Sequence, residues 1–219
     1  MKIEYDQTRK NMVDNQLLTN GVIDHDLLAS MGNVPREYFA PKNYQSVAYS
    51  DMDIKLDQAG RYLMAPVSIG RLIQTSQIDT SDVVLVVGSG IGYSLAIIAN
   101  LASAVVGVEH NSELVDQATQ ILVDLDVGNG VVVHGDVSKG LPSEAPYDVI
   151  IIEGSVDSVP TSLFKQLRDG GRLIAAINQG AIDIVTIYKK TGDDIGSTQM
   201  FDIKLPALYL TEKASEFNF

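Results

Sequence analysis

The chain has 219 residues, 45% of them hydrophobic, and this length suits one domain with a substantial buried core. Its formal net charge of −12 makes nucleic acid and anionic membrane surfaces poor partners, and the absence of cysteine excludes disulfides, thiolate metal sites and cysteine nucleophiles. The first residues are polar and no stretch is long and apolar enough to span a bilayer. We therefore expect no signal peptide, no membrane partner and a cytoplasmic location. The three histidines share no helical spacing, so no metal site is expected.

The N-terminal third predicts helices. Apolar spacing predicts a helix over 6–19, and Asp24 is placed to cap a second helix. A third helix opens at Pro66, because proline is tolerated in the first helical turn. We interpret residues 1–80 as a helical cap within a single domain that covers residues 1–219.

Residues 81–219 are predicted to form an α/β core. The run 83–87 is apolar at every position, which is typical of a parallel strand buried on both faces. The further strands are predicted over 105–108, 131–133, 149–152 and 172–175, and the helices over 94–101 and 112–125 and from Pro160 through Leu167. This alternation predicts a doubly wound, mostly parallel, Rossmann-like sheet.

The C-terminal part has a different pattern. Residues 183–189, 199–205 and 208–211 are strand-rich and have no helix between them. We therefore expect antiparallel strands at one edge of the sheet.

Three alternating glycines follow the first buried strand and precede a helix, in the segment Gly88-Ser89-Gly90-Ile91-Gly92-Tyr93. Glycines allow positive φ and close approach of a ligand, and the next helix offers free N–H groups. A dinucleotide fingerprint would need a glycine at Tyr93 or Leu95, so an NAD-dependent oxidoreductase is disfavoured. The loop also has no lysine or arginine to meet a phosphate.

Acidic residues stand at the ends of the next two strands. Glu109, next to His110, is placed to accept hydrogen bonds from two ribose hydroxyls, with a solvated strand end as the alternative. Asp136, next to Val137, is placed to accept from an adenine amino group, with an Asx turn as the alternative. Two such acids favour an adenosyl ligand without a pyrophosphate.

The glycine loop is similar to the first motif of class I S-adenosylmethionine-dependent methyltransferases. Nearly the whole chain resembles the protein-L-isoaspartate O-methyltransferases. Seven stretches carry the resemblance: 11–17, 29–41, 88–94, 108–109, 134–136, 147–151 and 166–173. The two N-terminal stretches are the specific part, because many methyltransferases share the glycine motif.

The resemblance implies an enzyme that methylates the α-carboxylate of isoaspartyl residues in damaged proteins, with S-adenosylmethionine as cofactor. The glycines would wrap the methionine part of the cofactor, Glu109 its ribose and Asp136 its adenine, while Glu153 would face the mouth of the pocket. The full set of implied cofactor-binding residues is Gly88, Ser89, Gly90, Gly92, Tyr93, Glu109, His110, Asp136, Val137 and Glu153.

Two positions, Met64 and Val86, depart from the family pattern. Met64 stands where the family has a serine associated with the catalytic centre, and a thioether cannot donate a hydrogen bond. Arg61 is the candidate to grip an acceptor carboxylate through a bidentate fork, with a solvated loop arginine as the alternative. For Met64 the alternative is core packing. Val86 replaces an acid that the family places two residues before the first glycine.

Methyl transfer to a carboxylate depends mainly on positioning and desolvation, so the loss of the serine does not exclude it. The expected partner is an isoaspartyl-containing protein or peptide, or a small carboxylate acceptor. An O-methyltransferase for another small acceptor and a non-catalytic S-adenosylmethionine-binding protein are the alternatives.

Overall fold

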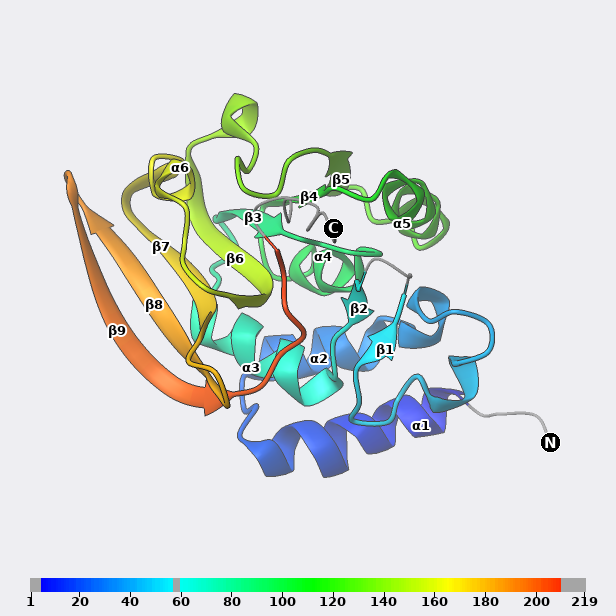
Figure 1. Ribbon diagram of the computed structural model, residues 1–219. Helices are drawn as coiled ribbons and strands as arrows, with labels where there is room; N and C mark the ends of the chain where they lie inside the picture. The colour runs from blue at the N-terminus through cyan, green and yellow to red at the C-terminus, as the bar shows by residue number, and fades with distance from the viewer. Residues whose placement is uncertain (1–4, 57–59, 210–219) are drawn as a thin grey trace, which may run out of the picture.

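A seven-stranded sheet forms the centre of the computed structural model, which describes residues 5–56 and 60–209 (Figure 1). The strand order is β5-β4-β3-β6-β7-β8-β9. The strands are β3 (Val83–Val87), β4 (Ala104–Glu109), β5 (Gly130–His134), β6 (Tyr147–Val156), β7 (Leu167–Asn178), β8 (Asp183–Thr191) and β9 (Asp194–Ile203). Neighbouring strands from β5 to β7 in this order pair parallel, whereas β8 pairs antiparallel with both β7 and β9. The predicted mostly parallel sheet with an antiparallel edge is therefore confirmed.

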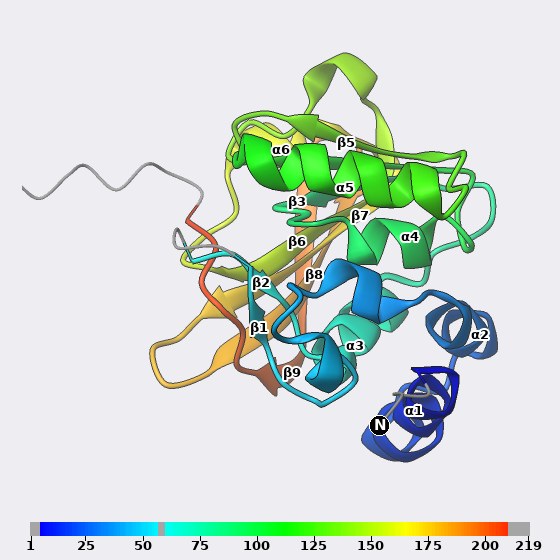
Figure 2. The same ribbon diagram turned by 90° about the vertical axis from the view of Figure 1, so that its right-hand side faces the viewer.

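The helices lie mainly on one side of this sheet (Figures 1 and 2). They are α1 (Tyr5–Met12), α2 (His25–Asn33), α3 (Pro66–Ser76), α4 (Tyr93–Ile98), α5 (Ser112–Asp124) and α6 (Thr161–Phe164). The predicted helix over 6–19 continues past α1 as a π turn (Val13–Leu17) and a 3-10 turn (Leu18–Asn20). Asp24 caps α2 as predicted, because its side chain accepts a hydrogen bond from the backbone N–H of Leu27 at 2.9 Å.

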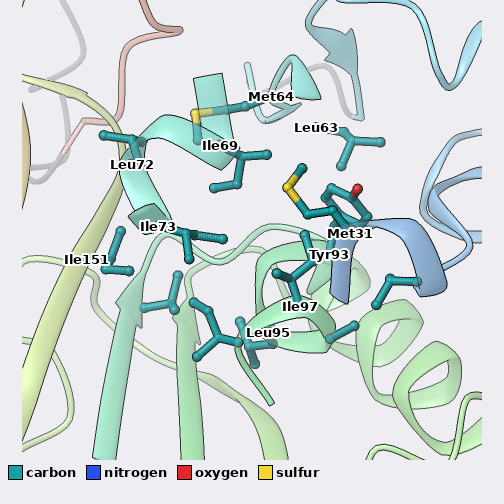
Figure 3. Packing of buried hydrophobic residues seen from close by; sticks show 14 of the residues in the cluster. Met31, Leu63, Met64, Ile69, Leu72, Ile73, Tyr93, Leu95, Ile97 and Ile151 are labelled. Carbon is teal, nitrogen blue, oxygen red and sulfur yellow. The ribbon is translucent and has the colours of Figure 1, made fainter. Parts of the chain in front are cut away.

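The two faces of the sheet bury separate clusters of apolar side chains. Along β3, Val84 and Val86 point into the first cluster, whereas Leu85 and Val87 point into the second. The first cluster joins the sheet to side chains from α1 to α5, and Figure 3 shows part of it. The second is closed by α6 and by Leu208 from the C-terminal segment. Burial on both faces explains why β3 is apolar at every position.

The structure corrects two predictions about the C-terminal half. The helix predicted from Pro160 through Leu167 ends at Phe164, and Leu167 begins β7 by pairing with Tyr147. The third edge strand predicted over 208–211 is absent at its described residues: residue 207 makes one isolated bridge, to Ser155, and residues 210–211 lie outside the described part of the chain.

A short hairpin that the sequence analysis did not predict positions Arg61 (Figure 2). Strands β1 (Ile54–Lys55) and β2 (Tyr62–Leu63) pair antiparallel, and the backbone N–H of Leu56 donates to the carbonyl of Arg61 at 2.8 Å. The buried Arg36 supports the residue after β2, because its Nη2 donates to the carbonyl of Met64 at 2.6 Å. The side chain of Arg61 therefore leaves the hairpin from a fixed backbone.

The packing of the glycine loop against β4 generates a prediction at Gly107. A Cβ added there would lie 2.6 Å from Oγ and 2.8 Å from Cβ of Ser89, so an alanine must push the loop away. We expect Gly107→Ala to lower the free energy of unfolding by about 1–3 kcal/mol in urea titrations, the usual range for overpacking. Gly196→Ala in β9 is the control, because no heavy atom lies within 4 Å of its Cβ position. Equal losses in both variants would contradict this account.

Candidate active site

The predicted site residues meet at the carboxyl ends of three neighbouring strands. Gly88 directly follows β3, Glu109 ends β4, and Glu153 lies near the end of β6. β3 lies between β4 and β6, so the strand order reverses here. In open α/β sheets this switch point is where ligands bind.

The glycine loop has the backbone conformation that the sequence predicted. Gly88, Gly90 and Gly92 have φ values of +75°, +53° and +85°, a region that side chains with a Cβ rarely adopt. A Cβ on Gly88 would lie 2.7 Å from Cδ2 of Leu208 and 3.2 Å from Nη2 of Arg61. The loop thus turns tightly, and the side chains of Leu208 and Arg61 lie against Gly88.

Glu109 is fully buried beside this loop. One carboxylate oxygen, Oε2, accepts from the backbone N–H of Gly90 at 2.9 Å and from Nε of Arg61 at 3.2 Å. The other, Oε1, accepts from the N–H groups of His110 at 2.9 Å and Asn111 at 3.0 Å, and lies 2.9 Å from Nδ1 of His110. The alternative of a solvated strand end is therefore wrong, because the side chain is 0% exposed.

Arg61 lies inside the site. The residue is 5% exposed, and besides its ion pair with Glu109 its Nη2 donates to the carbonyl of Gly88. The alternative of a solvated loop arginine is wrong for this reason. The guanidinium contacts the glycine loop and the acid that was predicted to hold a ribose.

Glu153 is the second buried acid of the site. Its Oε2 accepts a hydrogen bond from Oγ of Ser94 at 2.5 Å. The pKa of the Glu153 carboxyl is raised to about 7, mainly by burial and also by the nearby charge of Glu109, whereas the Ser94 hydrogen bond and the charge of Arg61 oppose the shift. At neutral pH the carboxyl therefore exists in both protonated and ionised forms.

Tyr93 and Met64 lie in the core next to the site (Figure 3). The ring of Tyr93 packs edge-on against Phe39 at a centroid distance of 5.3 Å, and the Arg36 guanidinium lies 4.7 Å from its centroid. Met64 is 2% exposed and belongs to the same buried cluster as Ile69, both labelled in Figure 3. These contacts match the core-packing interpretation of Met64, and they place Tyr93 where it supports the start of α4.

The loop after β5 forms an Asx turn. Oδ1 of Asp136 accepts from the N–H of Ser138 at 2.9 Å and from its Oγ at 2.6 Å, and Oδ2 lies 3.1 Å from Nζ of Lys139. The Ser138 hydroxyl and the ammonium lower the pKa of Asp136, which is exposed. Val137 is buried in the second cluster. The turn alternative for Asp136 is thus seen in the structure, and its side chain remains open to solvent.

Two residues of the site, Ser94 and Leu208, were not predicted from the sequence to be site residues. Ser94 lay in a matching stretch, but its pairing with Glu153 joins residues 59 positions apart. Leu208 reaches Gly88 because the C-terminal segment pairs with the end of β6, where the N–H of Leu208 donates to the carbonyl of Ser155 at 2.7 Å. A leucine in an irregular segment gives no local signal of such a contact.

Comparison with known proteins identifies the family. The family model of protein-L-isoaspartate(D-aspartate) O-methyltransferase matches residues 7–211. The chain belongs to this family. The resemblance noted from the sequence is therefore confirmed.

Curated relatives and solved structures agree with this assignment. Protein-L-isoaspartate O-methyltransferases from Rhodopseudomonas palustris and Methanoculleus marisnigri are 34% and 36% identical, over 91% and 84% of this chain and 82% and 84% of theirs. A solved protein-L-isoaspartate O-methyltransferase matches with a TM-score of 0.82 at 26% identity, over 92% of this chain and 66% of that chain. A Plasmodium falciparum structure in complex with S-adenosyl-L-homocysteine matches in fold, with a TM-score of 0.77 at 18% identity, over 96% of this chain and 100% of that chain.

The chemistry of the site fits the cofactor of this family, S-adenosylmethionine. Two buried acids, Glu109 and Glu153, would repel a phosphate but suit a ligand that carries hydroxyl and amino groups. The buried Oγ of Ser89 has no hydrogen-bond partner within the described residues. Within residues 5–56 and 60–209, no three His, Asp or Glu side chains are grouped to hold a metal ion.

The raised pKa of Glu153 predicts how stability depends on pH. Between its usual value of 4.5 and about 7, the folded protein keeps a proton that the unfolded chain has released. The contribution of Glu153 to the free energy of unfolding is therefore complete below pH 4.5, falls as the pH rises through this window, and is lost above about 7.

Wild type should consequently lose of the order of 3 kcal/mol relative to Glu153→Gln between pH 4.5 and 8, measured by urea unfolding at both ends. Glu113→Gln, at an exposed position of α5, is the control and should follow the wild-type pH dependence. Parallel curves for wild type and Glu153→Gln would show that the burial of Glu153 has no effect on its proton affinity.

Proposed function

We propose that this chain transfers the methyl group of S-adenosylmethionine to the α-carboxylate of isoaspartyl residues in damaged proteins and peptides. The observation that carries the proposal is the hydrogen bond from Gly90 N–H to the carboxylate of Glu109, which joins the glycine loop to a buried acid at the switch point of the sheet. In a chain of this family, that arrangement supports a nucleoside site built from Gly88, Gly90 and Glu109.

The cofactor supplies a methyl group that is already activated on a sulfonium. The acceptor carboxylate is ionised at neutral pH, so the protein need not provide a general base. What the chain contributes is position and the exclusion of water: Leu208 covers Gly88, and the carboxyls of Glu109 and Glu153 are buried.

Two features lower the repulsion that the buried acids would exert on a carboxylate acceptor. With a pKa of about 7, Glu153 is partly neutral at physiological pH, which lowers its repulsion of an incoming carboxylate. Arg61 adds a positive charge near both buried acids. Met64 takes no part in this account, because its side chain packs in the core. The same charges would also accept a small free carboxylate, which is the second candidate acceptor.

The test is methyl transfer from labelled S-adenosylmethionine to an isoaspartyl peptide, with the matching aspartyl peptide as control. We expect label on the isoaspartyl peptide alone, released again by mild base as expected of a methyl ester. Label on a small carboxylate but on neither peptide would favour the second candidate. Measurable cofactor binding without transfer to any carboxylate would refute the proposed function.

A further inference from the structure

The side chain of Arg61 contacts Glu109 on the side that faces the glycine loop. Its Nε lies 3.2 Å from Oε2 of Glu109, and its Nη2 donates to the carbonyl of Gly88. The same Nη2 lies 3.9 Å from the Cβ position of Gly90. The guanidinium thus spans the space between the loop and the acid, where the proposed function requires the cofactor.

The remaining contacts of Glu109 leave no free position for a ribose. A carboxylate offers about four lone-pair sites. The backbone N–H groups of Gly90, His110 and Asn111 take three of them, and these donors are fixed by the turns that follow β3 and β4. Two side-chain contacts can open without unfolding a turn: that of His110 Nδ1 to Oε1, and that of Arg61 Nε to Oε2. The contact to Arg61 is the one that faces the loop.

We propose that Arg61 competes with the cofactor's ribose for Glu109, so that binding displaces the guanidinium and Arg61 sets the affinity. The inference rests on the proposed function for its cofactor, and it is independent of the acceptor. Arg61 is a positioning residue in this account, since it acts through Glu109.

The displaced guanidinium would keep an anionic neighbour. The backbone carbonyl of Arg61 is held by the N–H of Leu56, so the displacement is a rotation of the side chain that leaves the pairing of β1 and β2 intact. The second buried acid, Glu153, is near enough for the two charges to interact. Leaving Glu109 therefore does not leave the cation without an anionic neighbour.

Competition and direct binding make opposite predictions for the variant Arg61→Gln. In the cofactor-free protein the ion pair offsets the cost of burying Glu109, so its loss should lower the melting temperature. Cofactor affinity should nevertheless rise, because the ligand no longer has to open the pair. A guanidinium that contacts the cofactor directly would instead lower both quantities when removed.

The experiment is calorimetric titration of wild type and Arg61→Gln with S-adenosylmethionine and with S-adenosylhomocysteine, together with thermal unfolding without ligand. If the pair is open in about a tenth of the molecules, the variant should bind about tenfold more tightly. The factor should be the same for both ligands, because they share the ribose and differ in the charge at sulfur. Arg61→Lys keeps the charge but not the fork, so it should show a smaller gain and serves if Arg61→Gln does not fold.

Arg172→Gln is the matched control. Arg172 forms an ion pair of 2.9 Å with the mostly buried Asp82, which precedes the other end of β3. This variant should also melt at a lower temperature, but with unchanged cofactor affinity. It separates the effect at Glu109 from general loss of stability.

Weaker cofactor binding by Arg61→Gln and Arg61→Lys than by wild type would overturn the inference. A gain in affinity for S-adenosylmethionine but not for S-adenosylhomocysteine would also overturn it, as would the absence of binding by every variant. Tight binding by the variants without transfer to an isoaspartyl peptide would refute the proposed acceptor and leave the competition at Glu109 supported.

Discussion

The site depends on burying the carboxylate of Glu109 at the end of β4. A buried charge is stable only when donors surround it, and most of these donors are backbone N–H groups that point at one place. The N–H of Gly90 can do so because the glycines of the loop adopt positive φ. The loop conformation, the end of β4 and the position of the acid therefore depend on one another, and a change in any one of them would expose an uncompensated charge.

This requirement also explains how charge is distributed around the site. Arg61 balances Glu109 on the side of the loop, while Glu153, which accepts a hydrogen bond from Ser94, responds to burial by a higher pKa. Arg36 is fully buried in the neighbouring core, where its Nε donates to the carbonyl of Ala48 at 2.7 Å and its Nη2 to that of Met64 at 2.6 Å. The burial of charge is thus compensated by an ion pair at Glu109 and by a raised pKa at Glu153.

The sequence predicted the parts of this arrangement that local patterns determine. The strand predicted over 83–87 matches β3, because an apolar run and a following glycine decide both of its ends. Glu109 was placed correctly at the end of its strand, because it is the first polar residue after the apolar run of β4. Arg61 could not be placed, since its partner is 48 residues away and β1 and β2 are too short to give a periodic signal. Leu167 was assigned to a helix because its spacing from Leu163 suits a helix, although pairing with β6 decides its conformation.

The segment 61–64 sends its first and last side chains to different places. Met64, at the place of the family serine, packs in the core (Figure 3). Arg61, three residues earlier, turns into the site and binds Glu109. This segment therefore offers the site a guanidinium and no hydroxyl at position 64. Because the transferred methyl group needs positioning more than acid–base assistance, the missing hydroxyl affects how the site is stabilised more than the chemistry that it performs.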